Sequence, residues 1–192
     1  MQISLIKKEQ LTTTNWQGGT TTQLAIYPET AIYKNLDFIF RISTATIEVE
    51  QSTFTSLSNV ARVIMVLDGE LNIQHKNQYT KQLKKFETDS FSGNWETTSI
   101  GKVTDFNVMT RGLAKATALG FSLVGGCKKE CNINGDFFAV YVSQGEIIIE
   151  SPSQNINISQ GDIVIIRKEK ANEKFNILAT MPADVAIAEI YL

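Results

Sequence analysis

The chain has few residues that bind metals. One histidine, His75, and two cysteines, Cys127 and Cys131, stand among its 192 residues. A metal site built from several imidazoles is therefore excluded, and a zinc site, which normally takes four ligands, is disfavoured. The cysteines are interpreted as plain thiols, because a disulfide is not expected in a reducing compartment, with a redox or metal role as the alternative. We expect His75, beside Lys76 and Asn77, at a solvent-exposed turn.

The sequence also lacks long runs of basic residues and long runs of apolar residues. Its formal net charge is −2, and no basic run is longer than the pair Lys128-Lys129, so a nucleic-acid partner is not expected. No apolar stretch approaches the roughly 18 residues that a membrane span requires. Residues 1–8 place their charges after a short apolar stretch, which is not the pattern of a signal peptide. We therefore expect a cytoplasmic protein with no membrane partner.

Helical periodicity is missing as well, and β patterns take its place. Short runs rich in Val, Ile, Phe and Thr alternate with turn dipeptides such as Asp68-Gly69 and Gln144-Gly145. The one helix-friendly string, residues 113–119, is short and has no good N-cap, so it is interpreted as a strand or connector. The sequence predicts its clearest strands at residues 38–47, 61–67, 70–75, 137–142, 146–150, 162–167 and 185–191.

An internal repeat predicts how these strands are organised. Residues 62–73 match residues 138–149 as a strand, a turn that ends in glycine, a glutamate and a second strand. Two all-β halves of fewer than about 100 residues each favour two small barrels. A single β-sandwich with a chance similarity is the alternative.

The repeat also suggests a division of the chain. We predict one barrel at residues 1–115 and a second at residues 116–192. The terminal strands, at residues 3–6 and 185–191, could cross over to the other half, because unpaired strand edges favour pairing.

Three segments outside the repeat carry a family pattern. They are Trp16-Gln17-Gly18-Gly19-Thr20-Thr21-Thr22-Gln23-Leu24, which ends at Tyr27-Pro28, the strand 38–47 followed by Phe54 and Arg62, and Asp105-Phe106-Asn107-Val108-Met109-Thr110-Arg111-Gly112. Together with the glycine-glutamate hairpins, they make the chain resemble the HutD/Ves family of bacterial bicupins, within the cupin superfamily. The third segment is the most specific. Many members have an asparagine before the glycines of the first segment, which this chain lacks.

The resemblance implies a bicupin, two fused barrels of the RmlC-like jelly-roll type, without a metal or other cofactor. Cupin enzymes usually hold their metal with three histidines and a glutamate, which a chain with one histidine cannot supply. Members of the family are associated with histidine utilisation, where the resemblance implies a regulatory, ligand-sensing role, and others with cold or stress response. No catalytic residue follows from the resemblance.

Arginine is scarce, and its positions are informative. The chain has four arginines against fourteen lysines, and Arg41, Arg62 and Arg111 fall in the three family segments. Arg41 and Arg62 are embedded in apolar strand sequence, where a guanidinium group needs a partner. One interpretation is a bidentate grip on a ligand carboxylate, for which arginine is better shaped than lysine. The other is an internal ion pair, for instance with Asp105 or Glu70.

Further residues of these segments complete the candidate site. On a strand, Asp105 and Asn107 share one face and could line a barrel mouth, although such residues also close turns. Trp16 is interpreted either as a lid beside a glycine loop or as a plug for one barrel end. The sequence predicts that five side chains converge on one cavity of the first barrel, walled by the tryptophan and the glycine loop: Arg41, Arg62, Arg111, Asp105 and Asn107, with Trp16, Gly18 and Gly19.

Three functions are compatible with these residues. The one we favour is a non-catalytic protein that binds a small anionic molecule, a carboxylate or an amino-acid-derived metabolite, in a regulatory role. The second is a metal-independent isomerase or hydrolase with Asp105 or Glu70 as a general base. The third is a structural bicupin whose barrels are filled by their own side chains. A homodimer is compatible with each.

Overall fold

The computed structural model describes all residues, 1–192, and is almost entirely β-structure. Nineteen strands are joined by turns and by two short 3-10 helices, η1 (Lys8–Gln10) and η2 (Tyr33–Asn35). The all-β fold class predicted from the alternation of apolar and polar residues is confirmed. Most of the helix-friendly string at residues 113–119 lies in a strand, β12 (Lys115–Leu123). No helix has the length and apolar character needed to cross a membrane.

The chain forms two compact units. One is Thr12–Ala118, and the other combines Met1–Leu11 with Leu119–Leu192. This division differs from a single cut at residue 115, because β1 (Gln2–Ile6) pairs antiparallel with β17 (Ile163–Arg167). At the other end of the chain, β19 (Ala183–Tyr191) pairs within its own half.

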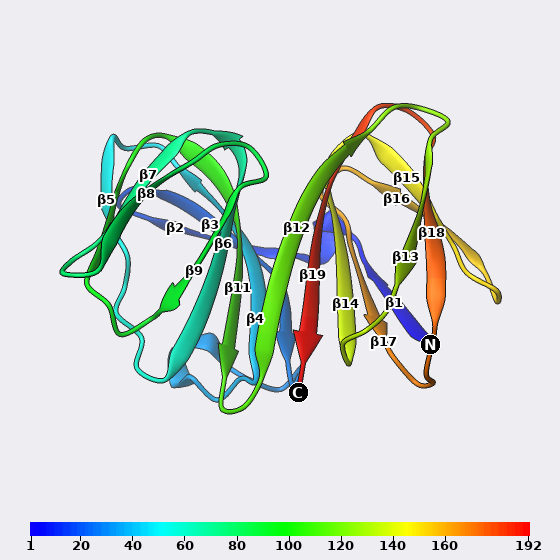
Figure 1. The fold of residues 1–192 in the computed structure, drawn as a ribbon, viewed down its shortest axis with the longest axis horizontal. Helices are drawn as coiled ribbons and strands as arrows, with labels where there is room; N and C mark the ends of the chain where they lie inside the picture. The colour runs from blue at the N-terminus through cyan, green and yellow to red at the C-terminus, as the bar shows by residue number, and fades with distance from the viewer. The chain divides into compact units, whose positions relative to one another are not determined.

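The Thr12–Ala118 unit contains two sheets, and all of their strands except β10 are labelled in Figure 1. The six-stranded sheet has the order β2-β3-β4-β11-β6-β9, with bounds β2 (Thr12–Trp16), β3 (Gly19–Tyr27), β4 (Phe40–Ile47), β6 (Val60–Gly69), β9 (Thr88–Ser92) and β11 (Val103–Arg111). The four-stranded sheet has the order β5-β10-β7-β8, with bounds β5 (Gln51–Thr53), β7 (Leu71–His75), β8 (Tyr79–Leu83) and β10 (Thr97–Ile100). Ile64 of the larger sheet and Ile73 of the smaller belong to one core cluster, so the two sheets share an apolar interior.

The other unit repeats this architecture. Its five-stranded sheet has the order β1-β17-β14-β19-β12, in which β14 spans Phe137–Gln144. Its four-stranded sheet has the order β13-β18-β15-β16, with bounds β13 (Lys128–Asn132), β15 (Glu146–Glu150), β16 (Asn155–Ser159) and β18 (Lys174–Ala179). Phe138 and Phe175, from the two sheets, meet edge to face in the core with ring centroids 5.2 Å apart.

The two hairpins of the sequence repeat occupy equivalent places in the two units. Gly69 ends β6 before β7, and Gly145 lies between β14 and β15. Both glycines have a positive φ, 85° and 80°, which a residue with a side chain rarely adopts. A Cβ atom at Gly69 would lie 2.6 Å from the Lys102 carbonyl oxygen. The glycine of each hairpin is therefore fixed by both its backbone conformation and its close neighbours.

Candidate functional site

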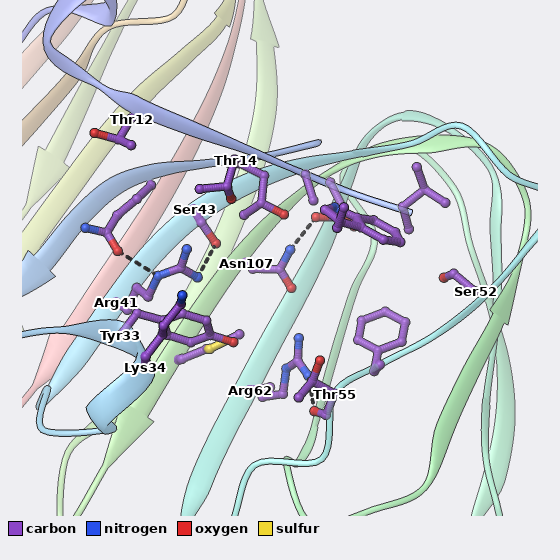
Figure 2. Close-up of a pocket in the computed structure, with 18 of the residues that line it drawn as sticks. Thr12, Thr14, Tyr33, Lys34, Arg41, Ser43, Ser52, Thr55, Arg62 and Asn107 are labelled. Carbon is purple, nitrogen blue, oxygen red and sulfur yellow. Dashed lines mark hydrogen bonds between the residues drawn. The ribbon is translucent and has the colours of Figure 1, made fainter. Parts of the chain in front are cut away.

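The Thr12–Ala118 unit contains a cavity of about 520 Å³, shown in Figure 2. Residues of β2, β3, β4, β6 and β11 line it, together with η2 and the segment at and after β5. Five of the eight residues predicted from the sequence lie in its wall: Trp16, Arg41, Arg62, Asp105 and Asn107.

Strand register explains why these side chains meet. β11 is flanked by β4 and β6, and Met109 of β11 is paired with Arg41 on one side and Arg62 on the other. Two and four residues earlier on β11, Asn107 and Asp105 point to the same face of the sheet as Met109, because side chains alternate along a strand. Three adjacent strands thus direct two guanidinium groups, an amide and a carboxyl group into one space.

Arg41 is held by neutral groups. Its Nε donates to the Gln23 side-chain oxygen at 2.9 Å, and one of its Nη atoms donates to the Ser43 hydroxyl at 3.1 Å. Its guanidinium also lies 4.2 Å from the centre of the Tyr33 ring. The side chain is buried, and no carboxylate neutralises it by a direct hydrogen bond.

Arg62 has still fewer hydrogen bonds. One Nη atom donates to the Thr55 carbonyl oxygen at 3.3 Å, while Nε is buried without a hydrogen-bond partner. The guanidinium lies 4.9 Å from the centre of the Phe54 ring and 5.5 Å from that of Phe91. Burial lowers the pKa of this guanidinium, and the charge of Asp105 acts in the opposite direction. An arginine nevertheless remains charged at neutral pH, so Arg62 is a buried cation with unused donors.

Asp105 and Asn107 form a hydrogen-bonded pair in the wall. The Asn107 amide nitrogen donates to the Asp105 carboxyl group, and the Asn107 side-chain oxygen is buried without a partner. Only 1% of Asp105 is exposed, and this burial raises its pKa to about 7. The charge of Arg62, the backbone N–H of Ala45 and the Asn107 amide each act to lower the pKa, but burial outweighs them.

The cavity wall has more positive than negative charge. Arg41 and Arg62 are buried cations, and Lys34 is an exposed one, whereas Asp105 is the only carboxyl group among the lining residues. Since Asp105 titrates near neutral pH, it offsets even one positive charge only in part. The interaction that the sequence offered as an alternative, an ion pair with Glu70, does not occur, because Glu70 is exposed and accepts a hydrogen bond from Gln82.

Trp16 lies in the cavity wall with 40% of its surface exposed, but the glycines after it do not line the cavity. Both glycines are buried beneath other groups instead. A Cβ atom at Gly18 would lie 2.2 Å from the Trp16 ring, and one at Gly19 would lie 1.9 Å from the Thr46 carbonyl oxygen. The prediction that Gly18 and Gly19 wall the cavity is therefore wrong. They allow the tryptophan ring and the neighbouring strand to approach closely.

Arg111 does not reach the cavity either. It is the last residue of β11, two positions beyond Met109, and roughly 13 Å along the strand from Asn107 at about 3.3 Å per residue. Arg111 borders a second hollow of about 830 Å³, which Trp95 and Thr110 also line and which Arg62 lines in addition to the first cavity. The prediction that all three arginines converge is wrong for Arg111, because the strand carries it past the end of the site.

His75 is buried, so its predicted exposed position is also wrong. Only 1% of the residue is exposed, and its two ring nitrogens lie 2.8 Å from the Thr97 hydroxyl and 2.8 Å from an Asp89 carboxylate oxygen. Tyr79 covers one side of the ring and donates its hydroxyl to Asp89 at 3.0 Å. Burial, together with Asp89, raises the pKa of Tyr79 to about 12. The histidine thus joins strands β7, β9 and β10 through a buried hydrogen-bond network.

Several residues of the site were not found from the sequence. Gln23 and Ser43 bind Arg41 and lie in the family segments, but nothing in their local pattern distinguishes them from other strand residues. Tyr33 lies in η2, outside every motif, and reaches Arg41 only because the connection from β3 to β4 folds over the cavity. Phe54 did belong to the family pattern, and it packs on Arg62.

Comparison with known proteins identifies the family. The model of the HutD family matches residues 8–185, a range that includes every residue lining the cavity. The chain belongs to the HutD family. No curated protein sequence matches it.

Several solved structures share the fold of this chain. A conserved protein of unknown function from Pseudomonas aeruginosa has a TM-score of 0.86 at 18% identity, with both chains covered in full. HutD from Pseudomonas fluorescens has a TM-score of 0.76 at 17% identity, covering 99% of this chain and 98% of that one. A bacterial pirin from Escherichia coli in complex with nickel(II) has a TM-score of 0.70 at 11% identity, covering 97% and 98%. At such low sequence identities, the structural similarity shows the fold alone. It confirms the predicted bicupin jelly roll.

The residues present in this HutD family member do not fit the metal site common among cupins. No group of three His, Cys, Asp or Glu side chains lies close enough together to hold a metal ion. Both ring nitrogens of the single histidine are engaged by Thr97 and Asp89. Cys127 is exposed and Cys131 is buried, both as free thiols, and burial raises the pKa of Cys131 to about 11.

Proposed function

We propose that this HutD family protein binds a small carboxylate or amino-acid-derived acid in the cavity of its Thr12–Ala118 unit, and that it does so in a regulatory rather than a catalytic role. The observation that carries the proposal is the pair Arg41 and Arg62, two buried guanidinium groups whose hydrogen bonds all go to neutral acceptors. An anionic molecule of the cytoplasm is the expected ligand.

Electrostatics supports this choice of ligand. An uncompensated buried charge costs several kcal/mol, and a bound carboxylate offsets that cost while it fills unused guanidinium donors. Arg62 has its Nε free for this purpose, and both arginines face the same cavity. A volume of about 520 Å³ is within the usual range for small-molecule pockets, which argues against a barrel filled by its own side chains.

The relatives supply a first probe and a metabolic context. One structure of HutD from Pseudomonas fluorescens is that of a formate condition. Formate is the simplest carboxylate and so serves as the first probe. The family name supports a connection to histidine utilisation. We therefore propose that the physiological ligand is an acid formed during histidine breakdown, and that its binding reports the level of that acid to another component of the cell.

A thermal-shift screen tests the proposal. The panel contains formate, short dicarboxylates and intermediates of histidine degradation, each against the wild type and an Arg41→Met/Arg62→Met double variant. A ligand at about 100 times its Kd stabilises the wild type by about 2.7 kcal/mol, which a melting curve detects readily. We expect at least one acid to raise the melting temperature of the wild type and not that of the variant. Equal shifts in both proteins, or none in the wild type, would contradict the proposal.

A metal-independent enzyme is the second candidate function, and one observation favours it. Asp105 is a buried carboxyl group in the cavity wall, and burial raises its pKa to about 7, the range in which a carboxylate acts as a general base or acid at neutral pH. Its test is turnover. An acid identified by the thermal-shift screen would be chemically converted by the wild type and left unchanged by Asp105→Asn.

A further inference from the structure

We propose that the cavity takes up one proton together with each carboxylate that it binds, that Asp105 holds this proton, and that the Asn107 amide reverses its orientation as the proton arrives. This inference rests on the proposed carboxylate-binding function and concerns how the same site is controlled. It starts from a hydrogen-bond mismatch in the cavity wall.

The mismatch lies in the Asn107 side chain. Its nitrogen donates to Asp105, which leaves its oxygen buried and without a donor. In Figure 2 the Asn107 oxygen points away from the hydrogen bond to Asp105 and toward the side of the cavity where Arg62 lies. A carboxylate placed between the two arginines would therefore meet the amide oxygen and the ionised Asp105. Both repel an anion.

A proton on Asp105 removes both obstacles. The carboxylic acid is neutral, and its O–H can donate to the Asn107 oxygen once the amide has turned by about 180°, which exchanges its two ends within almost the same volume. The Asn107 nitrogen then faces the space between Arg41 and Arg62 and can donate to the bound carboxylate. The proton comes from solvent, and no covalent bond other than the new O–H bond of Asp105 is formed.

The surroundings of Asp105 favour this exchange. Facing it are Arg62 from β6, the Ala45 N–H and more distantly Arg41 from β4, and Asn107 from its own strand, while Tyr33 and the exposed Lys34 lie on η2 at the cavity wall. A bound anion screens Arg62, the one nearby charge that favours the ionised form. Burial has already raised the pKa of Asp105 to about 7 before any ligand binds, so the proton is available near neutral pH.

The test measures formate affinity at pH 6.0 and pH 8.5, where formate itself remains a monoanion. Trp16, in the cavity wall, serves as the fluorescence reporter. For the wild type we expect affinity to be about tenfold or more weaker at pH 8.5, because binding must then include a proton that free Asp105 has lost. Asp105→Asn mimics the neutral acid and should bind formate equally at both pH values. Asp68→Asn, an exposed change on β6, should keep the wild-type pH dependence.

A second measurement uses the wild type alone, and so does not depend on the variants folding. When formate is added to the protein in weakly buffered solution at pH 8, the pH should rise. The size of the rise should correspond to the uptake of nearly one proton for each occupied site. Formate binding with equal affinity at both pH values and without proton uptake would overturn the coupling while leaving carboxylate binding intact. The absence of formate binding in the wild type and in Asp105→Asn at either pH would overturn both.

Discussion

At the residue scale, the contacts of Arg41 and Arg62 need the shape of a guanidinium group as well as its charge. Each group donates only some of its N–H groups to the protein, and each lies against an aromatic ring, Tyr33 for Arg41 and Phe54 for Arg62. These contacts fix the planes of the two groups while leaving donors for a ligand. A flexible ammonium group would make neither the stacked contact nor a bidentate one.

Arg41→Lys tests whether the shape of the guanidinium matters in addition to its charge. We expect carboxylate binding to weaken by about 1–3 kcal/mol, the usual range for a lost charge-assisted hydrogen bond, although the charge is retained. The free energy of unfolding should change less than the free energy of binding. Arg167→Lys, at an exposed position beside Phe137 in the other unit, is the matched control and should leave binding unchanged. Titration calorimetry gives the affinities, and an unaltered affinity for Arg41→Lys contradicts this role.

Asp105 makes a separate prediction about stability. Its folded-state pKa of about 7 lies above the ordinary value for an aspartate, so the folded protein binds a proton more tightly there than the unfolded chain does. This tighter proton binding stabilises the folded state. The stabilisation is fully present below about pH 4 and is lost as the pH rises through about 7. Asp105→Asn should therefore gain roughly 2–4 kcal/mol relative to the wild type at pH 8, and little at pH 4. Urea unfolding at the two pH values measures this, and a difference that does not depend on pH contradicts the assignment.

At the scale of elements, β2 is an exposed edge strand that ends in the cavity-lining Trp16. The strand pairs with β3 across the turn Gln17-Gly18, and the Trp16 ring packs directly on Gly18. The position of the aromatic wall of the cavity thus depends on a residue that has no side chain.

Gly18→Ala should displace the Trp16 ring, because a Cβ atom would lie 2.2 Å from it and the ring is the more mobile partner. We expect a change in tryptophan emission and weaker carboxylate binding, with a small change in unfolding free energy. The matched control is the same substitution in a Trp16→Phe background, where the emission change should vanish. Emission that is identical in wild type and Gly18→Ala would show that the ring does not rest on this glycine.

The hydrogen bonds of His75 with Thr97 and Asp89 lead to a prediction about the free energy of unfolding. His75→Leu removes the imidazole that engages Thr97 and Asp89, so buried polar groups lose a partner. We expect a loss of about 2–4 kcal/mol in unfolding free energy, in the range for unsatisfied buried groups. Gln74→Leu places the same new residue on the exposed side of the same strand and should cost far less. Equal unfolding midpoints for the two variants would contradict a structural role for His75.

At the scale of the whole molecule, the sequence predicted the architecture well because β-structure has a local pattern. Alternating apolar residues and glycine turns marked the β6–β7 and β14–β15 hairpins, and both glycines have the positive φ that such turns need. The crossing of β1 to β17 could be suggested only as an option, because strand pairing over more than 150 residues is decided by tertiary packing.

The site was predicted less completely, for reasons of geometry. Arg41, Arg62, Asp105 and Asn107 were found because charged and amide residues in apolar strands are rare and alternate by two along β11. Arg111 has the same parity as Asp105 and Asn107, and no sequence pattern shows where along a strand a cavity ends. His75 was misplaced because its partners, Asp89 and Thr97, come from strands that the sequence does not bring together.

The most direct test of carboxylate binding is a crystal structure of the protein grown in formate. The account predicts one formate ion in the Thr12–Ala118 unit, with its oxygens within hydrogen-bond distance of both Arg41 and Arg62 and with Trp16 at the edge of the occupied space. Formate found only on the protein surface, or two arginines turned to carboxylates of the chain with the cavity closed, would contradict it.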